Sequence, residues 1–472
     1  MLWLTYFLLS IPYVLPDEFA LVQYSSYVKN LLLGLEEKPD TNRFLFVNVA
    51  WDKVMVPKPD PDIPEHVIGQ EPITDRQKLV AFLKILEQNP NYAFVVFDIY
   101  FKGNTPYDKD LEALLNKIPR VLVSYHRDDK DKPDYPDLKI KPISLSDIEK
   151  VNEGKCLKFK LLHNDSLKTT PLLMYEQLHK KSFSKWGGFY FLDGRPILNS
   201  FILDYRIRNF HYVNQKYPKI HLGEWLQFAY KMPFNIEMSE AEMESAFAEA
   251  LLEDSLAQSS EDTVLIEVAT IADSSAPAPP SDNLQTDTSG LSSGEIDWEA
   301  LEQAAEEEAK QNNTAEYDVA ALDSAFVYPL LKDRIIFVGD FEDKDIHETI
   351  YGDTPGPIIL LDAFLAIENR DNALTLPFLS FLLLSYWLVT FLVLRYKNIQ
   401  GAWLQKLLRR KQASFFESMT IYILYFGIVS VVSFFLFNIH IGVLALAFYM
   451  YSFEWLRNLL LRRFGNRKAP AL

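Results

Sequence analysis

Long apolar segments near the carboxyl end constrain this 472-residue chain more than any other feature. Residues 374–394 carry no charged side chain, and a helix of that length crosses the roughly 30 Å hydrocarbon core of a bilayer. Residues 418–453 also lack Asp, Glu, Lys and Arg, but as one helix they would extend about 54 Å, too far for one crossing. The pattern predicts three transmembrane helices, the last two forming a hairpin (residues 418–456). Its spans are residues 419–437 and 441–456, and His440 in the turn is expected to be exposed to solvent.

Basic residues occur in the connection before the predicted hairpin and in the tail after it, but not in the hairpin turn. Residues 395–411 hold six Lys or Arg and no acid, and residues 457–472 hold five Lys or Arg and no acid. Because basic loops stay in the cytoplasm, we expect a cytoplasmic loop at residues 395–417 and a cytoplasmic tail at residues 457–472. The sequence therefore predicts a multi-pass inner (cytoplasmic) membrane protein whose soluble domain lies on the outer, periplasmic side.

A shorter apolar stretch opens the chain at residues 2–15. Pro12 interrupts it, and the small-residue pattern of a cleavage site is missing, which argues against a cleaved signal peptide. We expect residues 1–16 to be an uncleaved N-terminal transmembrane anchor. A signal-like segment and a longer natural N-terminus are the alternatives.

The sequence of the soluble part predicts an α/β domain. Residues 43–50, 92–101, 120–126 and 334–340 are short runs rich in Val, Ile and Phe without clean alternation, as expected of strands buried on both faces of a parallel sheet. Amphipathic helical patterns separate them, one opening with a capping box at Thr74 and Gln77. Residues 156–162 and 188–192 are predicted to form further strands, and strands in residues 155–230 can also pair antiparallel. The fold class predicted is a mixed, mainly parallel sheet with flanking helices, built from residues 17–235 and 326–373.

Residues 236–325 interrupt this domain. They contain 23 acidic residues and one basic residue, Lys310, so the net charge of −17 on the chain is a local property. Few large apolar side chains occur there, and such a segment cannot bury enough surface to offset its ordering entropy. We expect a largely disordered insert, acting either as a solvated spacer or as an acidic docking arm for a basic partner.

Candidate site residues follow the predicted strands, because ligands of α/β sheets bind beyond the carboxyl ends of strands. Asp98 ends one strand and Asp340 ends another, with Asp345 and His347 close behind, and a fifth candidate, Asp108, opens the helix after Asp98. Asp345 and His347 are of types that bind divalent metals. Asp98 and Asp345 could instead cap loops, and Asp108 and Asp110 could favour a helix N-terminus.

No motif for a metal, phosphate or nucleophilic site occurs, so no cofactor and no catalytic residue is assigned. The single cysteine, Cys156, excludes an intrachain disulfide.

The order of several weak motifs resembles a known family. Arg76, the segment FVVFDIYF containing Asp98, the segment from Pro106 to Leu111, and a closing strand at residues 331–339 followed by Asp345, Thr349 and Pro355-Gly356 are similar to the second type of CHASE domain. The resemblance implies an extracellular sensory domain, followed by transmembrane helices that lead to a cytoplasmic kinase or cyclase. It implies no ligand-binding residues.

Only 16 residues follow position 456, so we expect no output domain in this chain. The leading hypothesis is a non-catalytic sensory protein that relays a signal to a partner membrane protein, with its small-molecule ligand unknown. The alternative is a structural subunit of a multi-protein envelope complex that docks through the acidic insert. A metal enzyme using Asp98, Asp345 and His347 is the third hypothesis. Nucleic-acid binding is not expected, since no basic stripe with interleaved aromatics occurs.

Overall fold

The computed structural model describes ten segments of the chain. These are residues 1–11, 16–33, 39–59, 67–128, 130–148, 155–164, 166–207, 219–230, 324–395 and 415–464. The predicted acidic insert lies outside the described residues, apart from Ser324 and Ala325. The tail beyond residue 464 and most of the basic loop at residues 395–417 lie outside them too.

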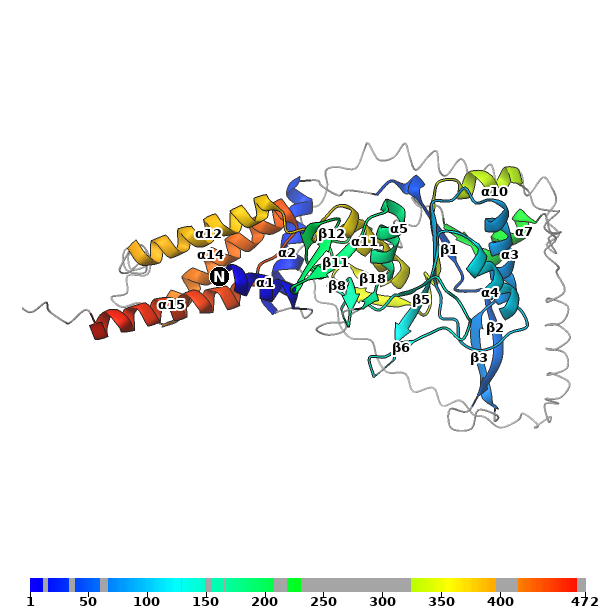
Figure 1. The fold of residues 1–472 in the computed structure, drawn as a ribbon, viewed down its shortest axis with the longest axis horizontal. Coiled ribbons are helices and arrows are strands. Elements are labelled where there is room, and N and C mark those ends of the chain that lie inside the picture. Colours follow the sequence, from blue (N-terminus) through cyan, green and yellow to red (C-terminus); the bar gives the residue numbers. More distant parts are fainter. Residues whose placement is uncertain are drawn as a thin grey trace, which may run out of the picture. The chain divides into compact units, whose positions relative to one another are not determined.

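A mainly parallel sheet forms the centre of the α/β part, as the sequence predicted (Figure 1). Its strands follow the order β15-β1-β16-β4-β5, β7 pairs parallel with β5, and β6 pairs antiparallel. β1 and β16 are buried along their whole length, as expected for central strands covered on both faces. The strands are β1 (Phe44–Asn48), β4 (Phe94–Asp98), β5 (Val121–Arg127), β6 (Pro133–Asp134), β7 (Ile143–Leu145), β15 (Lys219–His221) and β16 (Ile335–Gly339).

Strand β16 joins the two halves of the predicted domain. It comes after the acidic segment in the sequence but lies between β1 and β4, pairing Phe46 with Phe337 and Phe337 with Val96. A central strand contributed from beyond residue 330 means that the chain before and after the acidic segment shares one sheet.

Helices cover both faces of this sheet. On one side lie α3 (Arg76–Gln88), α4 (Asp108–Lys117), α7 (Leu222–Ala229) and α10 (Ser324–Leu331), and on the other lie α5 (Thr170–His179) and α11 (Gly356–Glu368) (Figure 1). The capping box predicted at Thr74 is wrong. Asp75 is the N-cap of α3, and its carboxylate accepts hydrogen bonds from the backbone N–H groups of Gln77 and Lys78, because a carboxylate one residue later reaches the same free donors.

Short antiparallel pairs complete the α/β part. They are β2 (Lys53–Pro59) with β3 (Val67–Thr74), β8 (Lys158–Lys160) with β14 (Ser200–Ile202), β9 (Leu162–His163) with β10 (Leu167–Lys168), and β17 (Ile346–Thr349) with β18 (Gly352–Pro355). A small three-stranded sheet contains β11 (Phe183–Trp186), β12 (Phe189–Leu192) and β13 (Arg195–Ile197). The antiparallel pairing considered for residues 155–230 is therefore present.

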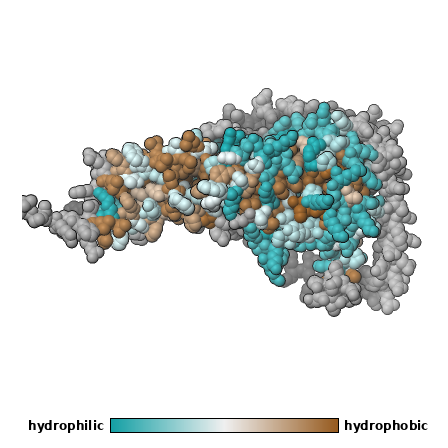
Figure 2. All heavy atoms as spheres, in the orientation of Figure 1, coloured by the Kyte–Doolittle hydropathy of each residue, from teal (hydrophilic) through white to brown (hydrophobic). Residues whose placement is uncertain are grey.

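Three long helices follow: α12 (Leu376–Arg395), α14 (Phe415–Phe437) and α15 (Val443–Phe464). Among the described residues, two segments are long and apolar enough to cross a membrane, Leu376–Leu394 and Met419–Phe437. The sequence predicted three, but the last helix carries Glu454 and Arg457 within its length. Figure 2 shows hydrophobic residues over this helical region and hydrophilic residues over the α/β part.

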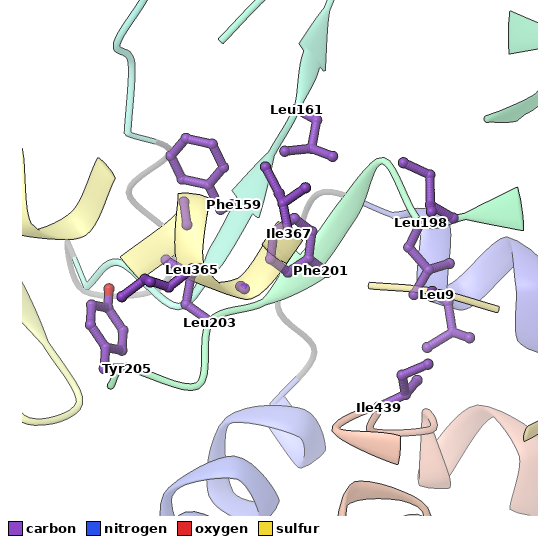
Figure 3. Packing of buried hydrophobic residues seen from close by; sticks show 14 of the residues in the cluster. Leu9, Phe159, Leu161, Leu198, Phe201, Leu203, Tyr205, Leu365, Ile367 and Ile439 are labelled. Atoms are coloured by element: carbon purple, nitrogen blue, oxygen red, sulfur yellow. The ribbon is translucent and has the colours of Figure 1, made fainter. Parts of the chain in front are cut away.

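The N-terminal segment differs from its prediction. Instead of one spanning helix, it contains α1 (Leu2–Ser10) and α2 (Pro16–Leu33). α1 has nine residues, which at 1.5 Å per residue extend about 14 Å, roughly half of a hydrocarbon core. Leu9 of α1 lies between Leu198 and Ile439 in the buried apolar cluster (Figure 3), so this helix packs against both the α/β part and the turn after α14.

Candidate functional site

A pocket of about 470 Å³ lies at the carboxyl ends of β1, β4, β5 and β16. This is the edge where the sequence placed the candidate residues, and it is the usual ligand position in parallel sheets. The antiparallel ribbon β2–β3 supplies the facing wall. The lining side chains are mostly polar or charged: Lys53, Glu71, Thr74, Asp98, Tyr100, Lys102, His126, Arg127, Asp134, Asp340, Lys344 and Asp345.

Asp98 has the largest pKa shift among the carboxyl groups of the pocket. Its side chain is partly buried, its Oδ1 atom is shielded from solvent, and the hydroxyls of Ser124 and Ser146 are its polar neighbours. Burial, reinforced by the negative charge of Asp345, raises the pKa of Asp98 to about 6. An acid in this state can exchange a proton near neutral pH or bind a ligand donor group.

Asp345 and His347 also belong to this edge, but they contact each other. His347 Nε2 lies 2.8 Å from Asp345 Oδ1, so the two residues considered as possible metal ligands bond to each other. Asp340 lines the pocket as predicted and also caps its own loop, accepting hydrogen bonds from the backbone N–H groups of Glu342 and Asp343. The loop-capping role considered for Asp98 and Asp345 is therefore found at Asp340 instead.

Asp108 is not part of the pocket. Its carboxylate pairs with the buried guanidinium of Arg76 and accepts a hydrogen bond from the backbone N–H of Thr105, at 3.1 Å. Asp108 and Asp110 lie in the first turn of α4, so the helix-start interpretation is correct for them. Arg76 also donates to the carbonyl of Lys102, which ties α3 and α4 to the loop after β4.

The cationic side of the pocket was not predicted from the sequence. Lys53 Nζ lies 3.5 Å from Asp340, and His126 and Arg127 both pair with Asp147. Burial lowers the pKa of His126, but Asp147 and the charge of Asp98 outweigh it and raise the pKa overall. His126 ends a predicted strand, so the rule that selected Asp98 could have found it. Lys53 stands on a ribbon that the sequence did not reveal.

Helix α11 begins at this pocket. The carboxylate of Asp345 packs directly on Gly356, the first residue of α11, because a Cβ atom there would lie 2.2 Å from Asp345 Oδ2. Every residue from Gly356 to Ile367 is buried. Asp362 within the helix accepts hydrogen bonds from the backbone N–H groups of Arg206 and Ile207. α11 is therefore a packed element running from the pocket toward the start of α12.

A cluster of buried and partly buried polar side chains lies between the end of α11 and the start of α12. We name it the junction cluster, and its members are Lys29, Asp204, Arg206, Asp371 and Asn438. Arg206 donates to Asp371 at 2.6 Å, and Asn438 donates to the other oxygen of Asp371 at 2.9 Å. Lys29 of α2 contacts both Asp204 and Asn438. Four segments distant in sequence therefore meet in one hydrogen-bonded group.

The turn between α14 and α15 is part of this contact. Asn438 adopts a left-handed backbone with φ of 58°, which Asn tolerates better than most residues. His440 is buried rather than exposed as predicted, since its ring stacks on Phe434 at 4.3 Å between centroids. Asp17 of α2 caps the first turn of α15 by accepting from the N–H groups of Val443 and Leu444. The α/β part, α2 and the helical hairpin are thus held together by specific bonds.

The chemistry available at the pocket is ion pairing and proton exchange. Among the residues that the structure describes, no three His, Cys, Asp or Glu side chains converge to hold a metal ion. Comparison of the chain with protein-family models, with curated proteins and with solved structures finds no match.

Proposed function

We propose that this chain is a membrane-anchored sensory protein that detects a small molecule or proton outside the cytoplasm and passes the signal to a partner membrane protein. The observation that carries the proposal is α11, a buried helix that contacts the pocket at Gly356 and leads into the junction cluster at Asp371. A change at the pocket wall can therefore shift a rigid element that ends at the membrane helices. The resemblance to the second type of CHASE domain supports the same function.

The proposed placement has three crossings, with the pocket outside. α12 and α14 are long and apolar enough for two of them, and α15 packs along α14 through a hydrogen bond from Tyr422 to Glu454. The basic residues of the loop after α12 and of the tail favour the cytoplasmic side. With α15 crossing as the third span, the tail and the α/β part lie on opposite sides of the inner membrane.

Affinity purification of the full-length chain from native membranes, followed by mass spectrometry, tests the proposed relay. We expect a membrane protein with a cytoplasmic kinase or cyclase domain to co-purify, and its output to change in the pocket variant Asp98→Asn. The matched control is Asp353→Asn, an exposed carboxylate on β18 outside the pocket. Equal output from wild type and Asp98→Asn would remove the sensory role.

Deletion of residues 240–320 separates this proposal from the alternative, a structural subunit that docks through the acidic insert. A relay through the membrane helices predicts that the complex survives the deletion. Loss of the complex, together with co-purification of structural envelope proteins only, would establish the docking role instead.

A further inference from the structure

A second pocket, of about 260 Å³, lies beside the first two turns of α12. Its walls come from α1, from β12 and β13, and from α12, and its apolar side chains include Leu2, Leu9, Phe189, Pro196, Phe378 and Leu379. The two hydroxyls at its wall are already engaged: Thr5 bonds to Tyr386, and Tyr6 donates to the carbonyl of Gly188 at 3.0 Å. A pocket without an available polar group selects hydrocarbon.

The position of the pocket, beside a candidate membrane span, indicates that the hydrocarbon would come from membrane lipid. Phe378, Leu379 and Leu382 belong to the start of the first candidate span. The outward side of the same helix exposes Leu384 and Trp387, which are 67% and 62% accessible. The pocket therefore shares α12 with a surface suited to lipid and lies at the depth where a span enters the bilayer.

Aromatic and basic side chains lie on α1 and on the adjoining β11–β12 hairpin. Trp3 and Trp186 are both 76% exposed, and Tyr6 packs on Phe189 with ring centroids 4.9 Å apart. Lys185 precedes Trp186 on β11, with its ammonium 5.6 Å from the ring of Tyr190. Trp and Tyr concentrate at the membrane–water interface, and a lysine beside them suits a lipid phosphate. The β11–β12 hairpin and α1 thus present side chains typical of a headgroup layer.

We infer that this pocket binds one acyl chain of an outer-leaflet phospholipid, with the β11–β12 hairpin resting on the headgroups. The inference rests on the proposed membrane placement of α12. The volume of about 260 Å³ is just below the roughly 300–1,000 Å³ of pockets for drug-sized ligands, so it holds part of one acyl chain rather than a whole lipid. A bound chain would fix α1 and the small sheet against α12, next to the junction cluster.

Photocrosslinking tests the site. The full-length protein is reconstituted into phosphatidylethanolamine and phosphatidylglycerol vesicles containing a phosphatidylcholine probe with a diazirine in the middle of one acyl chain. Labelled peptides are then mapped by mass spectrometry. We expect label on α1 and on the peptide containing Phe189 and Pro196, in addition to the outward faces of the spans. Leu379→Trp fills the pocket and should abolish the α1 and β12–β13 label, whereas Leu384→Trp, on the exposed side of the same helix, should not.

The outcomes separate the pocket from the placement. Label on the outward faces of α12 and α14 only, with none on α1 or the β12–β13 peptide, overturns the acyl-chain site and leaves the membrane placement standing. Absence of label from α12 and α14 overturns both. Because the wild-type map already decides between these results, the test remains decisive even where Leu379→Trp fails to fold.

Discussion

At the scale of single residues, the contact between Asp345 and Gly356 connects the polar pocket to α11. The carboxylate occupies the space that a side chain at position 356 would fill, with a Cβ atom 2.2 Å from Asp345 Oδ2 and 2.6 Å from its Cγ. Glycine at this position therefore reflects close packing against a pocket residue.

Gly356→Ala is expected to lower the free energy of unfolding by about 1–3 kcal/mol, since overpacking displaces a fitted neighbour. Removing that neighbour should restore the space, so the double variant Gly356→Ala/Asp345→Ala should be more stable than the two single effects predict. Denaturant unfolding of the four proteins in detergent measures this coupling. Strict additivity would show that the side chain of Asp345 does not occupy the space beside Gly356.

Asp98 gives the pocket a pH dependence. Its pKa is about 6 in the folded protein against an ordinary 3.8, so the folded state holds this proton more tightly than the unfolded state. The stabilisation is complete below about pH 4 and is lost as pH rises through 6. Asp98→Asn removes the charge that burial disfavours, and we expect it to be more stable than wild type at pH 7.5 by on the order of 1–3 kcal/mol.

This advantage of Asp98→Asn should shrink toward zero near pH 4, which unfolding midpoints at pH 4, 5, 6 and 7.5 would measure. Asp353→Asn, an exposed control, should show little difference from wild type at any of these values. A stability difference for Asp98→Asn that stays constant across the range would contradict the assigned pKa.

At the scale of elements, the junction cluster holds α2, α11 and the α14–α15 turn together. Arg206 and Asp371 are both buried, at 8% and 4% side-chain exposure. Burial raises the pKa of Asp371, against the opposing effects of Arg206 and Asn438. Such a pair contributes mainly through the penalty for breaking it, because one remaining charge is left buried.

Asp371→Ala is therefore expected to destabilise the protein by about 3–5 kcal/mol. The exposed pair of Lys181 and Asp193 supplies the control, because Lys181→Ala breaks a solvent-screened pair and should change stability far less than Asp371→Ala. Thermal unfolding in detergent compares the two. Equal effects at the two pairs would mean that the junction cluster does not hold the elements together.

Elements were predictable from sequence where burial alone determines them. The four parallel strands, the turn at Asn438 and the edge carrying Asp98, Asp340 and Asp345 all follow from local apolar runs and strand ends. The β2–β3 ribbon and the junction cluster do not. Lys29, Arg206 and Asp371 are far apart in sequence, and only tertiary packing brings such charges together. His440 was misjudged for the same reason, since its burial depends on Phe434 and on packing of the turn.

At the scale of the whole molecule, the number of crossings decides where the pocket faces. Three crossings place the carboxyl tail and the α/β part on opposite sides of the membrane, and two place them on the same side. Cys156 is buried, so with Cys156→Ala the chain becomes a cysteine-free background for labelling.

In that background we expect Lys185→Cys on the exposed β11–β12 hairpin to react with a membrane-impermeant maleimide in cells whose outer membrane has been permeabilised. Lys468→Cys in the tail should react only after the inner membrane is opened. Equal labelling of both positions with the inner membrane intact would show that α15 does not cross.

The central claim is that the pocket communicates with the membrane helices through α11. Hydrogen exchange of the full-length protein in lipid nanodiscs tests it most directly, comparing wild type with Asp345→Ala and with the control Asp134→Ala, which lines the pocket without contacting Gly356. Asp345→Ala should speed exchange in the first turn of α11, at residues 369–375 and in the turn at residues 438–442, while Asp134→Ala changes only the pocket. Changes confined to the pocket in both variants would contradict the account.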